Sequence, residues 1–178
     1  MATQSQALPL GTGSSREALF DDAIRLCTSL ISRIALSYEA DPAQRRELVQ
    51  DIFLAVWLAL PSFRNENSLK AFVASIAQKR SITHLTRRSR EPRKVELPPD
   101  LPSAALLPDE LAVQNQQKQH LVESIHKLPV PQREAIVLCF EGFSYTEMAQ
   151  MLGISTNAVM LRCQRAKSAL KTIMEGES

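Results

Sequence analysis

The 178-residue sequence is poor in aromatic residues and in glycine, and both shortages bear on its fold class. Phe, Trp and Tyr together make up 5% of the chain, and only five glycines are present. Sheet proteins draw on aromatic and β-branched residues and often place glycine in their turns. Leu, Ala, Gln, Glu and Arg are plentiful instead, and they favour helices. The composition therefore predicts an all-α protein rather than a β-sandwich or barrel.

Cysteine is also scarce, and its placement argues against a metal site. Cys27, Cys139 and Cys163 are far apart, and no CxxC motif or Cys/His pair has zinc spacing. We expect three free thiols in a reducing cytosol and no bound metal. No apolar run of about 18 residues occurs, so no membrane span is expected. The polar segment 1–15 lacks the pattern of a secretory signal, so a cytoplasmic protein is predicted.

Catalytic and cofactor motifs are missing as well. No Gly-rich phosphate loop, GxSxG or HExxH motif occurs. The only histidines are His84, His120 and His126, and the last two are six residues apart, which does not place them on one helix face. We therefore expect neither an enzyme nor a cofactor. The formal net charge of +2 is nearly neutral, so only local charge can indicate a partner.

The sequence does contain amphipathic helical patterns separated by clear breaks. Apolar residues recur at three- and four-residue spacing over residues 16–38. Asp41 followed by Pro42 is typical of a helix start, and Pro61 is expected to end that second helix.

A third helix is predicted after a polar turn, with Asn67 or Ser68 as its cap. Its apolar face changes phase near residues 78–81. The helix is therefore either buried on two sides or interrupted at that point.

A basic segment and a proline-rich segment follow. Seven Lys and Arg residues lie between positions 79 and 94, opposed only by Glu91, and five of the ten prolines lie between positions 92 and 108. Prolines at this density predict an extended linker at 95–115. We expect two small helical domains, at 16–94 and 116–178, preceded by a flexible tail at 1–15.

The last part of the chain carries the pattern of a helix-turn-helix. Ser144 and Glu147 predict a capping box, Gly153 suits a left-handed helix end, and Ser155 is placed to cap a second helix. The outward face of that second helix suits a DNA major groove. This face comprises Asn157, Met160, Leu161, Gln164, Arg165 and Ser168, with Arg162 at its boundary.

From this pattern alone, a protein-binding helical hairpin remains an alternative to a DNA-binding unit. The cations for phosphate are Arg162, Arg165, Lys167 and Lys171, and the amides of Asn157 and Gln164 can pair with base edges. Met160 and Leu161 are apolar, which suits either thymine methyl groups or a protein partner.

Two groups of segments, in this order, resemble the extracytoplasmic-function (ECF) sigma factors of the bacterial sigma-70 family. Those similar to region two of the family are 47–57, 60–64 and 72–77. Those similar to region four are 128–134, 142–155 and 162–170. The likeness extends over residues 16–94 and 116–174, which is most of the chain.

The resemblance implies RNA polymerase core and promoter DNA as partners. In the family, region two binds the β′ clamp helices and region four binds the β-flap. Core-binding positions implied here are Glu47, Gln50, Asp51 and Leu54. Minus-10 positions are Phe63, Arg64, Asn65, Asn67, Lys79, Arg80, Arg87 and Arg88. Minus-35 positions are Asn157, Met160, Leu161, Gln164 and Arg165.

The match departs from the family at Met160 and Leu161, where a basic and then a small polar residue usually stand. An altered promoter preference is therefore expected. The resemblance also suggests an anti-sigma factor as a partner, although no residue of this chain indicates one.

Two other function classes make different predictions. A stand-alone DNA-binding regulator would explain the helix-turn-helix, which LuxR-type regulators also contain, but not the helix at 47–57 or the basic segment at 79–94. It would bind duplex promoter DNA tightly without polymerase. An enzyme would need one of the missing motifs.

Overall fold

The computed structural model describes residues 12–64, 68–90 and 109–176, with side chains from residue 16 in the first range and from residue 115 in the last. Over these ranges all regular structure is helical, and the predicted all-α class is confirmed. The elements are α1 (Thr12–Leu36), α2 (Pro42–Ala59), a 3-10 turn η1 (Leu60–Ser62), α3 (Leu69–Arg90), α4 (Asp109–His126), α5 (Val130–Phe140), α6 (Tyr145–Leu152) and α7 (Thr156–Gly176). Residues 12–15, expected in the tail, and residues 109–115, expected in the linker, are therefore helical instead. None of the described helices is long and apolar enough to cross a membrane.

Helices α1, α2 and α3 form what we call the N-terminal unit. The side chain of Asp41 caps α2 by accepting a hydrogen bond from the backbone N–H of Gln44, at 2.7 Å, and Pro42 begins the helix as predicted. Pro61 lies in the 3-10 turn that ends it. The core of the unit is made of fully buried aliphatic side chains, among them Leu30, Ile31, Ile34, Leu48, Ile52, Val56 and Val73.

Helix α3 is continuous, so of the two alternatives left by its sequence, burial on two sides is the correct one. Ser68 caps it, with its hydroxyl oxygen accepting from the backbone N–H of Ala71 at 3.1 Å, whereas Asn67 lies outside the described residues. The apolar pattern breaks because three polar side chains, Gln78, Ser81 and His84, are buried on this helix.

Helices α4 to α7 form the C-terminal unit. The predicted capping box is confirmed: the Ser144 hydroxyl accepts from the Glu147 N–H, and the Glu147 carboxylate accepts from the Ser144 N–H at 2.8 Å. Gly153 has a φ of +65°, a left-handed conformation that glycine adopts at little cost. The Ser155 hydroxyl then accepts from the N–H of Ala158 and caps α7.

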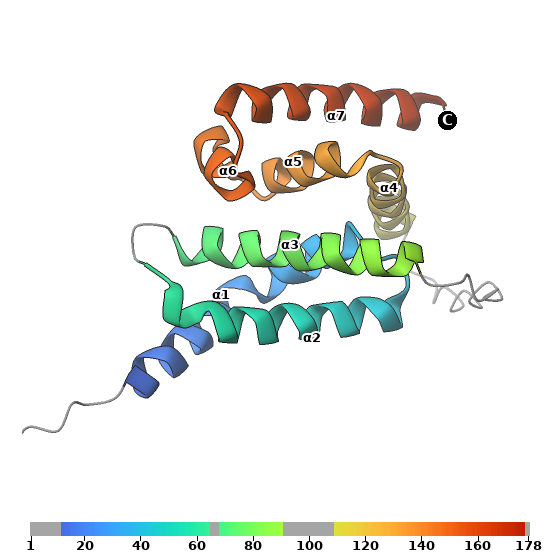
Figure 1. Ribbon diagram of the computed structural model, residues 1–178. Coiled ribbons are helices and arrows are strands. Elements are labelled where there is room, and N and C mark those ends of the chain that lie inside the picture. Colours follow the sequence, from blue (N-terminus) through green and yellow to red (C-terminus); the bar gives the residue numbers. More distant parts are fainter. Residues whose placement is uncertain (1–11, 65–67, 91–108, 177–178) are drawn as a thin grey trace, which may run out of the picture.

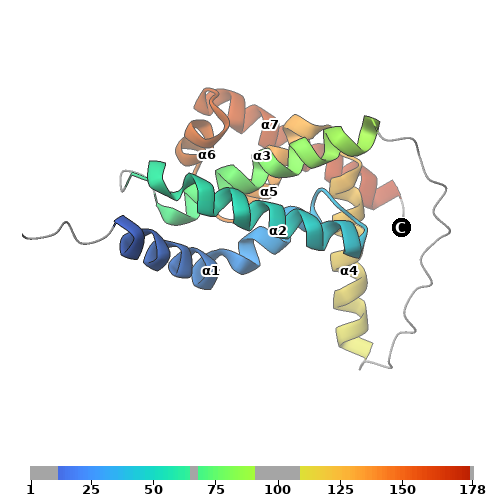
Figure 2. The same ribbon diagram turned by 60° about the horizontal axis from the view of Figure 1, so that its bottom comes forward.

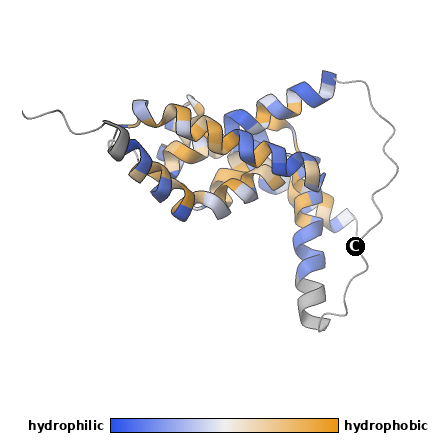
Figure 3. Ribbon diagram, turned by 90° about the horizontal axis from the view of Figure 1, so that it is seen from below, coloured by the Kyte–Doolittle hydropathy of each residue, from blue (hydrophilic) through white to orange (hydrophobic). Residues whose placement is uncertain are grey.

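The two units are stacked in layers (Figure 1). Helix α7 lies outermost, α5 lies beneath it, and α3 separates α5 from α2. Their buried apolar side chains belong to one continuous core. Figure 2 shows α4 projecting away from this body, and in Figure 3 the coloured part of the projection and the end of α3 are hydrophilic. The apolar residues thus concentrate where the helices meet.

Candidate nucleic-acid and polymerase interfaces

One exposed stripe runs along α2. Glu47, Gln50 and Asp51 are exposed, and Leu54 follows at 56% exposure. Leu58, which our sequence analysis did not single out, continues the stripe at 61% exposure. It could have been found as the residue one helical turn beyond Leu54. Large apolar side chains beside acidic and amide groups at this exposure are typical of a protein-binding surface.

A second exposed feature is the basic row on α3. Lys79, Arg80 and Arg87 are exposed, and the positions 80 and 87 are two helical turns apart. Three cations along one helix form a surface suited to phosphate groups.

Arg88, which the sequence grouped with these cations, points instead toward the interior. Its guanidinium binds the Glu39 carboxylate, which is 4% exposed and also contacts the His84 ring at 2.8 Å. The backbone N–H of Asp41 donates to the same carboxylate at 2.9 Å. Burial raises the pKa of Glu39, but the hydrogen bonds from Arg88, His84 and Asp41 outweigh it, and the net pKa is lowered. Arg88 therefore ties α3 to the chain segment before α2.

The segment before α3 brings Phe63 and Arg64 to the surface at the start of the basic helix. Phe63 is half-buried, with its ring centroid 5.0 Å from that of Phe72, while Arg64 is exposed. Asn65 and Asn67 lie outside the described residues.

The face of α7 that was predicted to point outward is exposed, and the opposite face is buried. Val159, Cys163, Ala166 and Leu170 are buried. The opposite face leaves exposed Asn157, Met160, Leu161, Gln164 and Arg165.

The boundary residue Arg162 of this face is half-buried and lies 3.8 Å from the carboxylate of Glu134 on α5. Burial raises the pKa of Glu134, and the charge of Arg162 opposes that shift. Arg162 thus helps to hold α7 against α5 and is set back from the exposed face.

Within the described ranges, no cluster of three His, Cys, Asp or Glu side chains could hold a metal ion. The three cysteines are free, and Cys27 and Cys163 are buried.

Comparisons with known proteins match both parts of the chain to one protein family. Residues 23–91 match the family model for sigma-70 region 2, and residues 118–170 match that for sigma-70 region 4. The ECF RNA polymerase sigma factor ShbA of Streptomyces griseus subsp. griseus is 30% identical, over 86% of this chain and 82% of its own length. The chain belongs to the ECF sigma factors of the sigma-70 family. An ECF sigma factor is a promoter-specific transcription initiation factor, a class that acts through polymerase rather than as an enzyme.

Two solved structures share the fold of this ECF sigma factor. One is CnrH in complex with the cytosolic domain of CnrY, with a TM-score of 0.69, 23% identity and 93% coverage of both chains. The other is the sigma factor RpoE in complex with the anti-sigma factor NepR from Bartonella quintana, with a TM-score of 0.68 and 23% identity. That match covers 88% of this chain and 96% of the other.

Proposed function

We propose that this chain binds RNA polymerase core, brings it to promoters with distinct minus-35 and minus-10 elements, and assists melting at the latter. The observation that carries the proposal is the presence of two separate outward faces, the stripe on α2 and the exposed face of α7, on a chain with both sigma regions. In this proposal the two working domains are those expected at 16–94 and 116–178, the second extended to Asp109, where α4 begins. The segment between them connects the two domains, and the protein acts in the cytoplasm.

Polymerase docking is assigned to the α2 stripe. Its exposed leucines, Leu54 and Leu58, supply apolar contact area, and the neighbouring Asp51 supplies charge that fixes orientation. By family resemblance the partner surface is the β′ clamp helices. The β-flap is the corresponding partner of the C-terminal unit.

Minus-10 recognition is assigned to α3 and the segment before it. Strand capture requires an aromatic or apolar surface for the base and cations for the backbone. Phe63 lies beside Arg64, while Lys79, Arg80 and Arg87 continue the positive charge along α3. Arg88 is better assigned to stability than to DNA, because its guanidinium is bound to Glu39. Asn65 and Asn67 are retained as candidates from the sequence alone.

Minus-35 recognition is assigned to the exposed face of α7. Asn157 lies in the first turn, where a recognition helix approaches base edges, and Gln164 and Arg165 lie about two turns further on. Gln pairs well with adenine, and Arg with guanine or phosphate. Met160 and Leu161, at 39% and 43% exposure, suit thymine methyl groups.

An anti-sigma factor is a further proposed partner. Support comes from the RpoE structure, which contains its anti-sigma factor NepR, and from the broad similarity of the two folds.

Run-off transcription with purified core polymerase on a library of promoter fragments tests the proposal. New start sites that require this chain are expected, and their shared motif will show what α7 recognises. Gln164→Ala should relax preference at one minus-35 position by about 1–3 kcal/mol. Binding of duplex promoter DNA by the chain alone, without any association with core, would instead identify a stand-alone regulator.

A further inference from the structure

Two of the three cysteines, which are far apart in the sequence, come together where α5 packs against α7. Cys139 lies in the last turn of α5, and Cys163 lies on the buried face of α7. The Cys163 sulfur is 3.8 Å from the backbone carbonyl oxygen of Ala135. In an α-helix that carbonyl accepts from the N–H of the residue four positions further on, which here is Cys139. The Cys163 thiol therefore lies beside the turn of α5 that ends at Cys139.

The Cys139 side chain lies on the same side of this turn. Residues four apart share a helix face, and each Cα–Cβ bond tilts toward the start of the helix, which here is toward Ala135. The two thiols are close enough for a hydrogen bond between them. Ala135 on α5 and Ala166 on α7 are both fully buried, so small side chains adjoin the pair. Cα atoms that face each other across two closely packed helices are about 4–6 Å apart, the separation that a disulfide requires.

The environments of the two thiols differ. Cys139 is half-buried, so it is the one that a small polar molecule can reach. Cys163 is fully buried, and burial raises the pKa of its thiol to about 11, with a further increase from the neighbouring Cys139. Lys167, one turn along α7, opposes that shift through its positive charge. Cys139 is therefore the residue that meets a reactant first, and Cys163 is a protonated partner behind it.

We propose that Cys139 and Cys163 form a redox modification site, in which a hydroperoxide converts the two thiols to a disulfide and thereby weakens recognition of the minus-35 element by α7. The inference rests on the proposed function of α7, whereas formation of the disulfide can be tested without DNA or polymerase.

The chemistry takes two steps. The Cys139 thiolate attacks an oxygen of the hydroperoxide and becomes a sulfenic acid, while the O–O bond breaks and the leaving oxygen takes up the proton that the thiol released. The Cys163 sulfur then attacks the Cys139 sulfur, the S–OH bond breaks, and the hydroxyl leaves as water with the proton of Cys163. The sulfurs are oxidised and the peroxide is reduced to water, or to water and an alcohol. A dithiol reductant reverses the bond by thiol–disulfide exchange.

The disulfide affects α7 because Cys163 directly precedes two of the residues assigned to minus-35 recognition. In the reduced chain the Cys163 sulfur lies against the carbonyl of Ala135, one turn before Cys139. To bond to Cys139 it must leave that carbonyl and move toward the end of α5. Gln164 and Arg165 are the next residues of α7, so they move with it.

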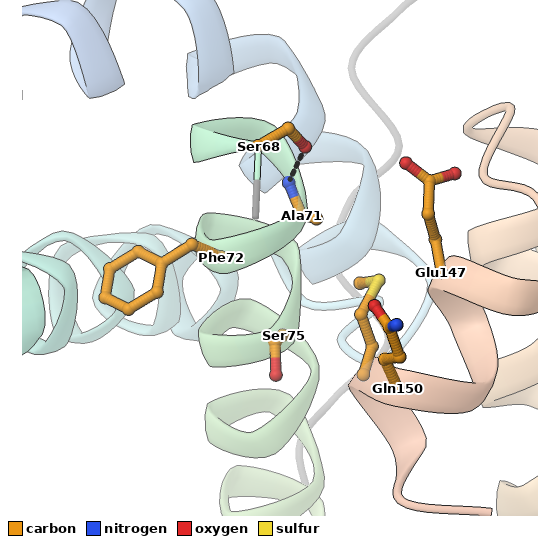
Figure 4. Close-up of a pocket in the computed structure, with 7 residues that line it drawn as sticks. Ser68, Ala71, Phe72, Ser75, Glu147 and Gln150 are labelled. Atoms are coloured by element: carbon orange, nitrogen blue, oxygen red, sulfur yellow. Dashed lines mark hydrogen bonds between the residues drawn. The ribbon is translucent and has the colours of Figure 1, made fainter. Parts of the chain in front are cut away.

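Helix α6, which precedes α7 in the helix-turn-helix, is supported separately by α3. A cavity of about 270 Å³ lies between α6 and α3 (Figure 4). Ser68 and Ser75 line it from the α3 side, and Glu147 and Gln150 line it from α6. Because α6 also packs against α3, a pull on α7 toward the end of α5 changes the position of α7 relative to α6. The proposed base-reading side chains are then displaced from the rest of the helix-turn-helix.

The chemical test treats the full chain with hydrogen peroxide and maps its cysteines by mass spectrometry without reduction. Wild type should lose the mass of two hydrogens, and the peptides that contain Cys139 and Cys163 should be joined. Cys139→Ser should form no disulfide. Cys163→Ala should stop at a sulfenic acid on Cys139, which a dimedone probe labels. Cys27→Ala is the matched control, because Cys27 is buried on α1, and it should react like wild type.

The functional test adds the oxidised chain, freed of peroxide, to untreated core polymerase. Run-off transcription from a promoter with a minus-35 element should fall about tenfold at limiting protein, the loss expected for one bidentate base contact. Dithiothreitol should restore it, and Cys139→Ser should respond to neither treatment. Titration against labelled core separates this loss from a loss of polymerase binding, and circular dichroism of the reduced variants checks that they are folded.

Free thiols at both positions after peroxide treatment would overturn the modification site. A disulfide that leaves transcription unchanged would refute its effect on α7. If the reduced wild-type chain supports no transcription, the proposed function fails, and the mass analysis still decides whether the two cysteines join.

Discussion

At the residue scale, Glu39 shows how a side chain that looks unremarkable in the sequence can join distant segments. Its carboxylate receives donors from Asp41, His84 and Arg88, which belong to the start of α2 and the end of α3. The sequence shows that Arg88 is basic but not the direction in which it points, so we grouped it with the DNA-binding cations. Long-range partners of this kind are set by helix packing, which charge patterns along the chain do not encode.

Glu39→Gln should lower the free energy of unfolding by about 2–3 kcal/mol at pH 7, because it leaves Arg88 and His84 without their buried anion. The folded-state pKa of Glu39 is lowered from its ordinary 4.5. Its stabilising contribution is therefore present above pH 4.5 and is lost as the pH falls through the lower folded-state value. Urea unfolding at pH 7 and pH 3.5 should show a large difference between wild type and variant at pH 7 and a smaller one at pH 3.5. An equal difference at both pH values would contradict the assignment.

Gly153→Ala should destabilise the C-terminal unit by about 1 kcal/mol, because an L-residue is strained at a φ of +65°. No atom lies within 4 Å of the added Cβ, so the cost is conformational rather than steric. Thermal unfolding measures it. Gly176→Ala, near the end of α7, is the matched control and should leave the melting temperature nearly unchanged.

At the scale of the elements, the helix ends that carry caps were predicted well because caps are local, whereas the starts of α1 at Thr12 and α4 at Asp109 were not. Asp41, Ser144 and Gly153 all act within a few residues of their own position, so their roles follow directly from the sequence. The two-sided burial of α3 was harder to predict, because Gln78 hydrogen-bonds to the C-terminal unit. Apolar periodicity predicts a single inner face and gives no signal for a buried amide.

Asp51→Arg should weaken binding to core polymerase without unfolding the N-terminal unit, because Asp51 lies on the exposed stripe of α2. A rim charge reversal of this kind costs roughly tenfold or more in affinity. Titration against labelled core measures the change. Asp21→Arg, on the exposed surface of α1, is the control, and an equal loss for both variants would place the docking surface elsewhere.

At the scale of the whole molecule, the two-domain character follows from the sequence, but the packing of the units on one another does not. The interface depends on Arg33, Lys70 and Glu141, ordinary surface residues in the sequence whose partners lie in distant segments. Some parts of the candidate site could likewise be predicted from the sequence, and others could not. The outward face of α7 follows from apolar periodicity and the α2 positions follow from the family resemblance, whereas the packing of α6 beside α3 requires the folded arrangement.

The triple variant Lys79→Ala/Arg80→Ala/Arg87→Ala should reduce the salt dependence of promoter binding by the holoenzyme. If each cation neutralises one phosphate, the slope of log K against log salt concentration should fall by about 2–3 units. Filter binding between 50 and 300 mM salt measures the slope, and core binding should be unchanged. Arg25→Ala/Lys118→Ala/Lys127→Ala is the control on other surfaces, and a slope equal to that of this control would show that the basic row does not contact DNA.

The basic residues of α3 differ in their surroundings, and this difference affects how the sequence can change in evolution. Arg88 is bound to a buried carboxylate, whereas Lys79 and Arg80 are exposed on the same helix. Under the proposed role of α3 in minus-10 recognition, substitutions at the two exposed positions change DNA affinity at little cost to folding, while position 88 is constrained by stability. Selection can therefore adjust affinity for promoter DNA through Lys79 and Arg80 while Arg88 preserves the fold. Among descendants of this sequence, variation should be greater at positions 79 and 80 than at position 88.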